Sequence, residues 1–147
     1  MIIKAGTLIL TADGARMRVL RNDGDAIKPA LATIIETSGE GAPSSALGTD
    51  RPGRVQSSVG ERRSGYEETD WHRQAEEEFA KMTAERLEKA ASENPKSELV
   101  VVAASRTLGE LRKHYGRETT ARMVAEIDKD LAGHTEREVC AAVVEFE

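Results

Sequence analysis

The chain has a single cysteine, Cys140, and few aromatic side chains. One cysteine excludes an internal disulfide and a cysteine-rich metal site. Aromatic residues make up 3% of the 147 residues, so the core must be built from Val, Ile, Leu, Ala and Met. No stretch approaches the roughly 18 apolar residues of a membrane-spanning helix, and the apolar first residues are too short for a secretory signal. We therefore expect a cytoplasmic protein without membrane contacts, folded as one domain over residues 1–147.

The charge balance is acidic, with a formal net charge of −5. Such a balance argues against broad, non-specific binding of nucleic acid, because phosphates repel a negative surface. It does not exclude a local basic patch. Between Gly48 and Gly65 there are four arginines against two acidic residues, Asp50 and Glu61.

Residues 37–68 show neither helical nor strand periodicity. They contain half of the 12 glycines, two prolines and four arginines. Structureless segments of about 30 residues are uncommon in compact domains, where they serve as binding loops or are disordered. The composition therefore predicts a flexible Gly/Arg-rich loop, in which we expect the function to lie.

The segment before this loop predicts a meander of three antiparallel strands. Thr7–Ala12 is a short apolar run, and Ala15–Arg21 alternates apolar with basic residues. Asp13-Gly14 between them indicates a two-residue hairpin turn, because glycine tolerates a positive φ. The third strand is expected within Ile27–Thr37.

The segment after the loop predicts helices that alternate with strands. Apolar residues spaced three to five apart indicate an amphipathic helix over 71–92, with Thr69-Asp70 as N-cap and Trp71 as a core anchor. Leu99–Ala104 is an unbroken apolar run, typical of a central strand covered on both faces.

Two capping boxes predict the remaining helix starts. Thr107 with Glu110 begins a short helix that ends at Gly116, and Thr135 with Glu138 begins the closing helix. The last strand is expected over 122–128.

This order of elements predicts an α/β fold with a mixed five-stranded sheet in the order 3-2-1-4-5 and three helices. A meander followed by a β-α-β-α segment places the helices on the sheet. Right-handed crossovers place the fourth strand beside the first and parallel to it. The expected arrangement is ribonuclease H-like.

Five short strings support a family resemblance: ADGARMRVL, GTDRPGR, ETDWH, RTLGELR and EIDKDLAGH, in this order over nearly the whole chain. In these strings the chain resembles the bacterial host-attachment protein family (protein required for attachment to host cells). That family is related to the central domain of archaeal and eukaryotic class-1 peptide-chain release factors. The resemblance implies a ribonuclease H-like fold of the translation-machinery-component type, with a loop that faces the ribosome or RNA.

In those release factors a Gly-Gly-Gln tripeptide in the loop before the long helix helps water to attack the peptidyl-tRNA ester. Here Arg54 and Val55 separate Gly53 from Gln56. Adjacent glycines let a backbone reach into a crowded site. Since this chain lacks them at that point, we do not carry the hydrolytic role over to Gln56.

The loop arginines are the main candidates for binding RNA. Arg51 and Arg54 flank Pro52, which stiffens their presentation to phosphates, and Arg62 and Arg63 can extend the contact. The alternative is a solvated loop whose arginines pair with nearby acidic residues.

Two further candidates lie outside the loop. His72 can bind an anion or act as an acid or base, or it is a solvated residue of the first helical turn. Arg106 lies at the carboxyl end of the central strand, a position that suits anions, although helix capping there is the alternative. The candidate RNA- or ribosome-binding residues are thus Arg51, Gly53, Arg54, Gln56, Arg62, Arg63, His72 and Arg106.

Asp13, Glu76 and Asp128 are the candidates for a two-metal nuclease site, because such sites hold metal ions between clustered carboxylates. Arg106 stands where a further carboxylate is wanted, and Asp13 is explained as a turn residue. We expect no metal and no cofactor.

Three functions remain open from the sequence. The first is a non-enzymatic, translation-associated module that binds the ribosome or RNA through the Arg/Gly-rich loop. The second is a hydrolase acting on peptidyl-tRNA or RNA. The third is a protein–protein module that is indirectly required for attachment to host cells.

Overall fold

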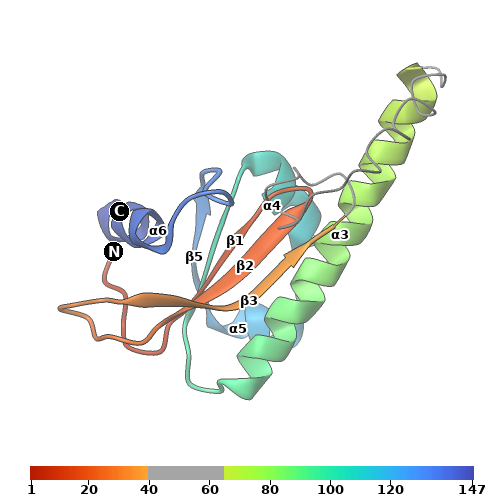
Figure 1. Ribbon diagram of the computed structural model, residues 1–147. Coiled ribbons are helices and arrows are strands. Elements are labelled where there is room, and N and C mark those ends of the chain that lie inside the picture. The colour runs from red at the N-terminus through yellow and green to blue at the C-terminus, as the bar shows by residue number, and fades with distance from the viewer. Residues whose placement is uncertain (40–64) are drawn as a thin grey trace.

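The computed structural model in Figure 1 describes residues 1–39 and 65–147, with side chains of the second range described from Trp71 onward. Its strands are β1 (Leu8–Ala12), β2 (Arg16–Asn22), β3 (Leu31–Ser38), β4 (Leu99–Ala103) and β5 (Met123–Asp128). Its described helices are α3 (Gly65–Glu93), α4 (Ser105–Arg112), α5 (Arg117–Arg122) and α6 (Glu136–Glu145). None of these helices is long and apolar enough to cross a membrane.

The five strands form one mixed sheet in the order β3-β2-β1-β4-β5, which confirms the predicted order. β1 pairs antiparallel with β2 and parallel with β4, so it lies where the meander meets the crossover segment. All residues of β1 and β4 are buried. For β4 this burial confirms the prediction from the unbroken apolar run Leu99–Ala104.

Alternate side chains of these central strands enter two separate cores, one on each face of the sheet. Leu8, Leu10 and Val101 pack with residues of α3 and α4. Ile9 and Val100 pack with residues of α6. The sheet is therefore covered on both faces, with α3 and α4 on one side and α6 on the other (Figure 1).

The hairpin between β1 and β2 is present, but its turn lies one residue later than the predicted Asp13-Gly14, and it is stabilised differently. The N–H of Asp13 donates to the carbonyl of Arg16 over 2.9 Å, so Gly14 and Ala15 are the two central residues. Among the described glycines only Gly6 has a positive φ. The Asp13 carboxylate accepts instead from the N–H groups of Ala15 and Arg16, at 2.8 and 2.7 Å.

Two predicted helix starts are wrong. Helix α3 begins at Gly65, so Asp70 lies inside the helix and is not its N-cap. Helix α4 begins at Ser105 after the extended residue Ala104, which places Thr107 inside the first turn. The strand before α4 ends at Ala103, and the next residue, Ala104, is already the N-cap, three residues before the predicted cap at Thr107.

The capping box at the start of α6 is confirmed. The Thr135 hydroxyl accepts from the N–H of Glu138, and the Glu138 carboxylate accepts from the N–H of Thr135. The short helix α5 was not predicted, because six residues are too few to show helical periodicity.

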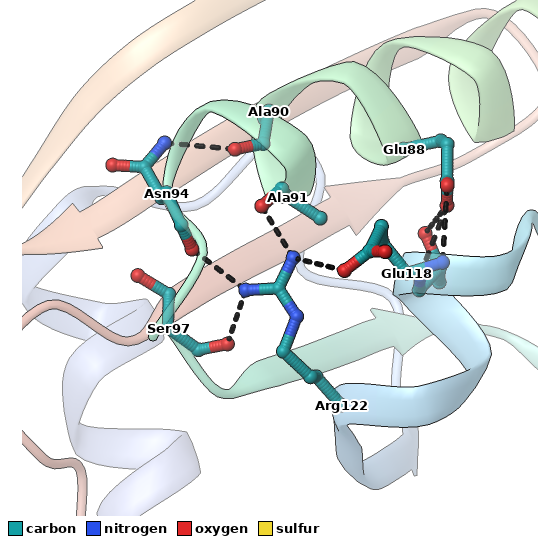
Figure 2. Close-up of polar contacts among 8 residues, drawn as sticks. Glu88, Ala90, Ala91, Asn94, Ser97, Glu118 and Arg122 are labelled. Carbon is teal, nitrogen blue, oxygen red and sulfur yellow. Dashed lines mark hydrogen bonds and ion pairs between the residues drawn. The ribbon is translucent and has the colours of Figure 1, made fainter.

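The carboxyl end of α3 and helix α5 cap each other, as Figure 2 shows. The Arg122 guanidinium donates to the backbone carbonyl of Ala91 in the last turn of α3 and to those of Asn94 and Ser97 in the segment that follows the helix. In return Glu88 of α3 accepts from the N–H groups of Glu118 and Thr119, at 3.0 and 2.9 Å. Helix ends expose unpaired carbonyls and N–H groups of opposite partial charge, and these two ionic side chains satisfy both ends.

The glycine before α5 makes this approach possible. A Cβ atom at Gly116 would lie 2.4 Å from Cδ of Glu88, closer than any ordinary contact. A side chain here would displace the Glu88 carboxylate from the first N–H groups of α5.

Replacing Arg122 by Met should lower the free energy of unfolding by about 2–4 kcal/mol, because half-buried carbonyls lose charged donors. Urea unfolding at neutral pH measures this. Arg117→Met, at an exposed position of the same helix, should stay within about 0.5 kcal/mol of wild type. Equal losses in the two variants would contradict the capping role of Arg122.

The capping role of Glu88 predicts a pH dependence. Burial opposes its ionisation, but hydrogen bonds from the backbone of Thr119 and Glu118 and from the Thr119 hydroxyl, with the charge of Arg122, outweigh burial and lower its pKa. Stability from a lowered carboxyl pKa is present above the unfolded value, about 4.3, and is lost as the pH falls through the folded value.

Glu88→Gln should therefore be less stable than wild type at pH 7, and the difference should shrink as the pH falls from about 5 to about 3. Urea unfolding at several pH values measures it. Glu85→Gln, which removes a charge from an exposed position on the same helix, is the control and should retain the wild-type pH dependence. A Glu88→Gln curve parallel to wild type would refute this assignment.

Candidate functional site

Helix α3 is longer than the sheet on which it packs. Its 29 residues span about 44 Å at 1.5 Å per residue, whereas the strands contain five to eight residues and span about 17–26 Å. The buried side chains of α3 begin at Phe79, and none of residues 71–78 is buried. Residues 65–78, which we call the overhang of α3, project past the sheet (Figure 1).

Trp71 and His72 lie on this overhang and are exposed. Trp71 is 41% exposed, so the prediction that it anchors the core is wrong. Its helical spacing with Ala75 and Phe79 is as predicted, but the buried side chains of α3 begin only at Phe79. The indole and the His72 imidazole meet edge to face, with ring centroids 5.5 Å apart and an interplanar angle of 73°.

Arg106 of α4 contacts the overhang one helical turn after His72. Its guanidinium forms an ion pair with Glu76 over 2.9 Å, with side chains 74% and 38% exposed. Glu76 in turn crosses the hairpin at Gly14, where an added Cβ would lie 2.9 Å from Cγ of Glu76. The fold thus brings His72, Glu76 and Arg106 to the same end of the molecule, at the carboxyl ends of β1 and β4.

A small recess of about 50 Å³ lies among these residues, lined by Asp13, Gly14, Glu76, Ala80, Arg106, Thr107 and Glu110. Ligand pockets usually measure about 300–1,000 Å³. This recess has room for a few water molecules. A larger partner can contact only its outer rim.

A larger groove of about 550 Å³ lies between β3 and α3. Its described lining residues are Ile35, Met82, Glu85, Arg86, Lys89, Ala90 and Glu93, none of them a candidate from the sequence. The α3 residues that line it lie between Met82 and Glu93, so the groove lies away from the overhang.

The carboxylates considered for a metal site have other partners. Asp13 forms an ion pair with Arg16 in the hairpin, and Asp128 accepts from the Ser105 hydroxyl. Within residues 1–39 and 71–147, no three His, Cys, Asp or Glu side chains are grouped to hold a metal ion.

The remaining candidates, Arg51, Gly53, Arg54, Gln56, Arg62 and Arg63, lie outside the described residues, as does most of the predicted loop. At its ends that loop is shorter than predicted, because β3 continues to Ser38 and α3 begins at Gly65.

The overhang is the feature that sequence reasoning missed. The sequence contained a signal for it, because α3 has several times as many residues as a strand of five. What concealed it was the regular apolar spacing, which gives no sign of where the sheet ends.

Comparison with known families identifies a release-factor-related family for this chain. The model of the family described as bacterial archaeo-eukaryotic release factor family 12 matches residues 6–143. None of the curated proteins matches this chain. The matched range includes every described strand and all of α3, with the overhang, Arg106 and His72.

His72→Ala and Arg106→Ala should each change the free energy of unfolding by less than about 1 kcal/mol, because an exposed histidine and an exposed ion pair stabilise little. Leu111→Ala, which truncates a fully buried side chain of α4, should cost about 2–5 kcal/mol. Chemical denaturation of the three variants provides the measurement. A loss in Arg106→Ala as large as in Leu111→Ala would assign Arg106 a structural role.

Proposed function

The chain belongs to bacterial archaeo-eukaryotic release factor family 12, and from this premise we propose that it is a non-enzymatic, translation-associated module that binds ribosomal RNA. The observation that carries the proposal is the family match, which spans the sheet, the segment between β3 and α3 and the overhang. The proposal also includes a cytoplasmic location.

The topology supports a ribonuclease H-like assignment. The sheet combines an antiparallel meander, β1 to β3, with the parallel strands β4 and β5 beside β1. We include this fold assignment, and a single domain over residues 1–147, in the proposal. A rigid sheet of this kind can hold a projecting helix at a constant angle toward a partner.

The proposed contact combines the overhang with the arginines that precede it in sequence. Arg62 and Arg63 come directly before α3, and Arg51 and Arg54 lie further along the same segment. Guanidinium groups bind phosphates in bidentate fashion. We propose that these four arginines hold phosphates while His72 and Arg106 contact the same partner, with Gly53 and Gln56 on the binding segment.

The proposal does not include hydrolysis of peptidyl-tRNA. The release-factor tripeptide has two adjacent glycines directly before its glutamine, whereas here Arg54 and Val55 separate Gly53 from Gln56. A link with attachment to host cells would be indirect, through translation.

Co-sedimentation with ribosomes across a salt series tests the proposal. Wild type should bind at low salt and dissociate as salt rises, because bound phosphates release counterions. Arg51→Ala/Arg54→Ala/Arg62→Ala/Arg63→Ala should fold normally and bind far more weakly. Its salt slope should be smaller than that of wild type by about one for each phosphate that it no longer binds.

The matched control removes four exposed positive charges elsewhere, in Lys96→Ala/Arg117→Ala/Lys129→Ala/Arg137→Ala. It should bind nearly as wild type does, although its net charge equals that of the loop variant. If wild type does not sediment with ribosomes at any salt, the proposal is wrong and protein partners become the explanation. If both variants lose binding equally, net charge and not the segment before α3 is responsible.

A further inference from the structure

Exposed aliphatic side chains gather at the end of the molecule opposite the overhang. Ile2, Ile27 and Val144 are 69%, 87% and 45% exposed, and they are three of the five large apolar side chains that are exposed within residues 1–39 and 71–147. In Figure 1 this end carries the labels N and C and the β2–β3 connection. Single exposed apolar side chains are common, but several at one place indicate a contact surface.

The buried Asn22 amide joins the β2–β3 connection to the segment that carries Ile2. Its Nδ2 donates to the carbonyls of Ile3 and Lys4, at 3.0 and 3.1 Å, and to that of Asp25 in the connection, at 3.3 Å. Its Oδ1 accepts from two N–H groups of the connection, both at 2.9 Å. The connection is therefore held beside the segment before β1.

Ile27 and Lys28 are exposed in this connection. The Asp25 carboxylate accepts from the N–H groups of both residues, at 2.9 and 2.7 Å, which fixes the local backbone. A partner that binds a preorganised segment of this kind pays little for ordering it.

The end of α6 lies on the other side of the segment that carries Ile2. The Met1 amino group donates to the carbonyls of Val143 and Val144, at 3.2 and 2.7 Å. Val144 and Glu145 are exposed there. Ile2 thus has two flanks, and each of them combines one exposed aliphatic side chain with one charged neighbour.

We propose that this end of the molecule binds a second copy of the same chain about a two-fold axis near Ile2. The axis places Ile2 beside its equivalent and sets each flank against the opposite flank of the other copy. Ile27 then meets Val144, and Lys28 meets Glu145. A two-fold contact requires such a self-complementary surface, and the opposite charges of the two flanks supply it.

This contact leaves the candidate functional site free. The overhang and Arg106 lie at the carboxyl ends of β1 and β4, whereas the proposed contact lies at their amino ends (Figure 1). A dimer would therefore present two such sites, and a ligand with two matching sites would be bound more tightly than by one copy. The inference does not depend on what these sites bind.

Sedimentation equilibrium over a series of protein concentrations up to about 1 mM, the weak end of specific association, tests the proposal. The mass of wild type should rise from 16.0 kDa toward twice that value. Ile2→Glu should remain monomeric, because it places two carboxylates at the axis. Val124→Glu makes the same change at an apolar residue of β5 that is 45% exposed, and this matched control should associate as wild type does.

Reversed charges test the two-fold arrangement itself. Lys28→Glu and Glu145→Lys should each weaken association about 5- to 50-fold, because each sets two like-charged pairs across the axis. An equal mixture of the two variants should associate as wild type does, since both pairs have opposite charges in the mixed dimer. The double variant Lys28→Glu/Glu145→Lys should recover association for the same reason.

Three results would overturn the proposal. They are a wild type that stays at 16.0 kDa at every concentration, an Ile2→Glu variant that associates like wild type, and a mixture of the charge variants that is no stronger than either variant alone. Urea unfolding should give wild-type stability for Ile2→Glu, because Ile2 is exposed. If that variant does not fold, the mixture of charge variants decides.

Discussion

Mutual capping between the last turn of α3 and α5 holds one end of this long helix. Arg122 donates to the carbonyl of Ala91 in the last turn of α3 and to that of Asn94 just after it, and Glu88 accepts from the N–H of Thr119 in the first turn of α5. A long helix on a small sheet needs one firmly held end, since residues 71–78 of α3 contribute no buried side chain. The cap supplies this at a point where two chain segments 30 residues apart meet.

From this fixed end, α3 crosses the sheet and continues past it. Its buried stripe, from Phe79 to Ala91, supplies the apolar contact with the core below β1 and β4. At the far edge the ion pair of Glu76 with Arg106 joins α3 to α4 over the hairpin. On the other side of that contact, residues 71–74 of α3 are exposed.

In the proposed contact, the arginines that precede α3 in sequence supply positive charge for phosphates. Affinity of this kind varies with salt, because bound phosphates release counterions. A protein with a net charge of −5 can bind RNA in this way only if its basic residues are concentrated at one place.

The sequence alone determined the strand order, the two-sided burial of β4 and the capping box at Thr135. The first follows from the order of elements and the right-handed crossover rule, and the other two follow from an apolar run and from short-range hydrogen bonds. Tertiary structure alone decided that Trp71 is exposed, that Arg106 meets Glu76 and that Arg122 caps α3. These features depend on where the sheet ends and which segments lie side by side. Periodicity describes one face of one helix, and it contains no information about the length of the surface that the helix meets.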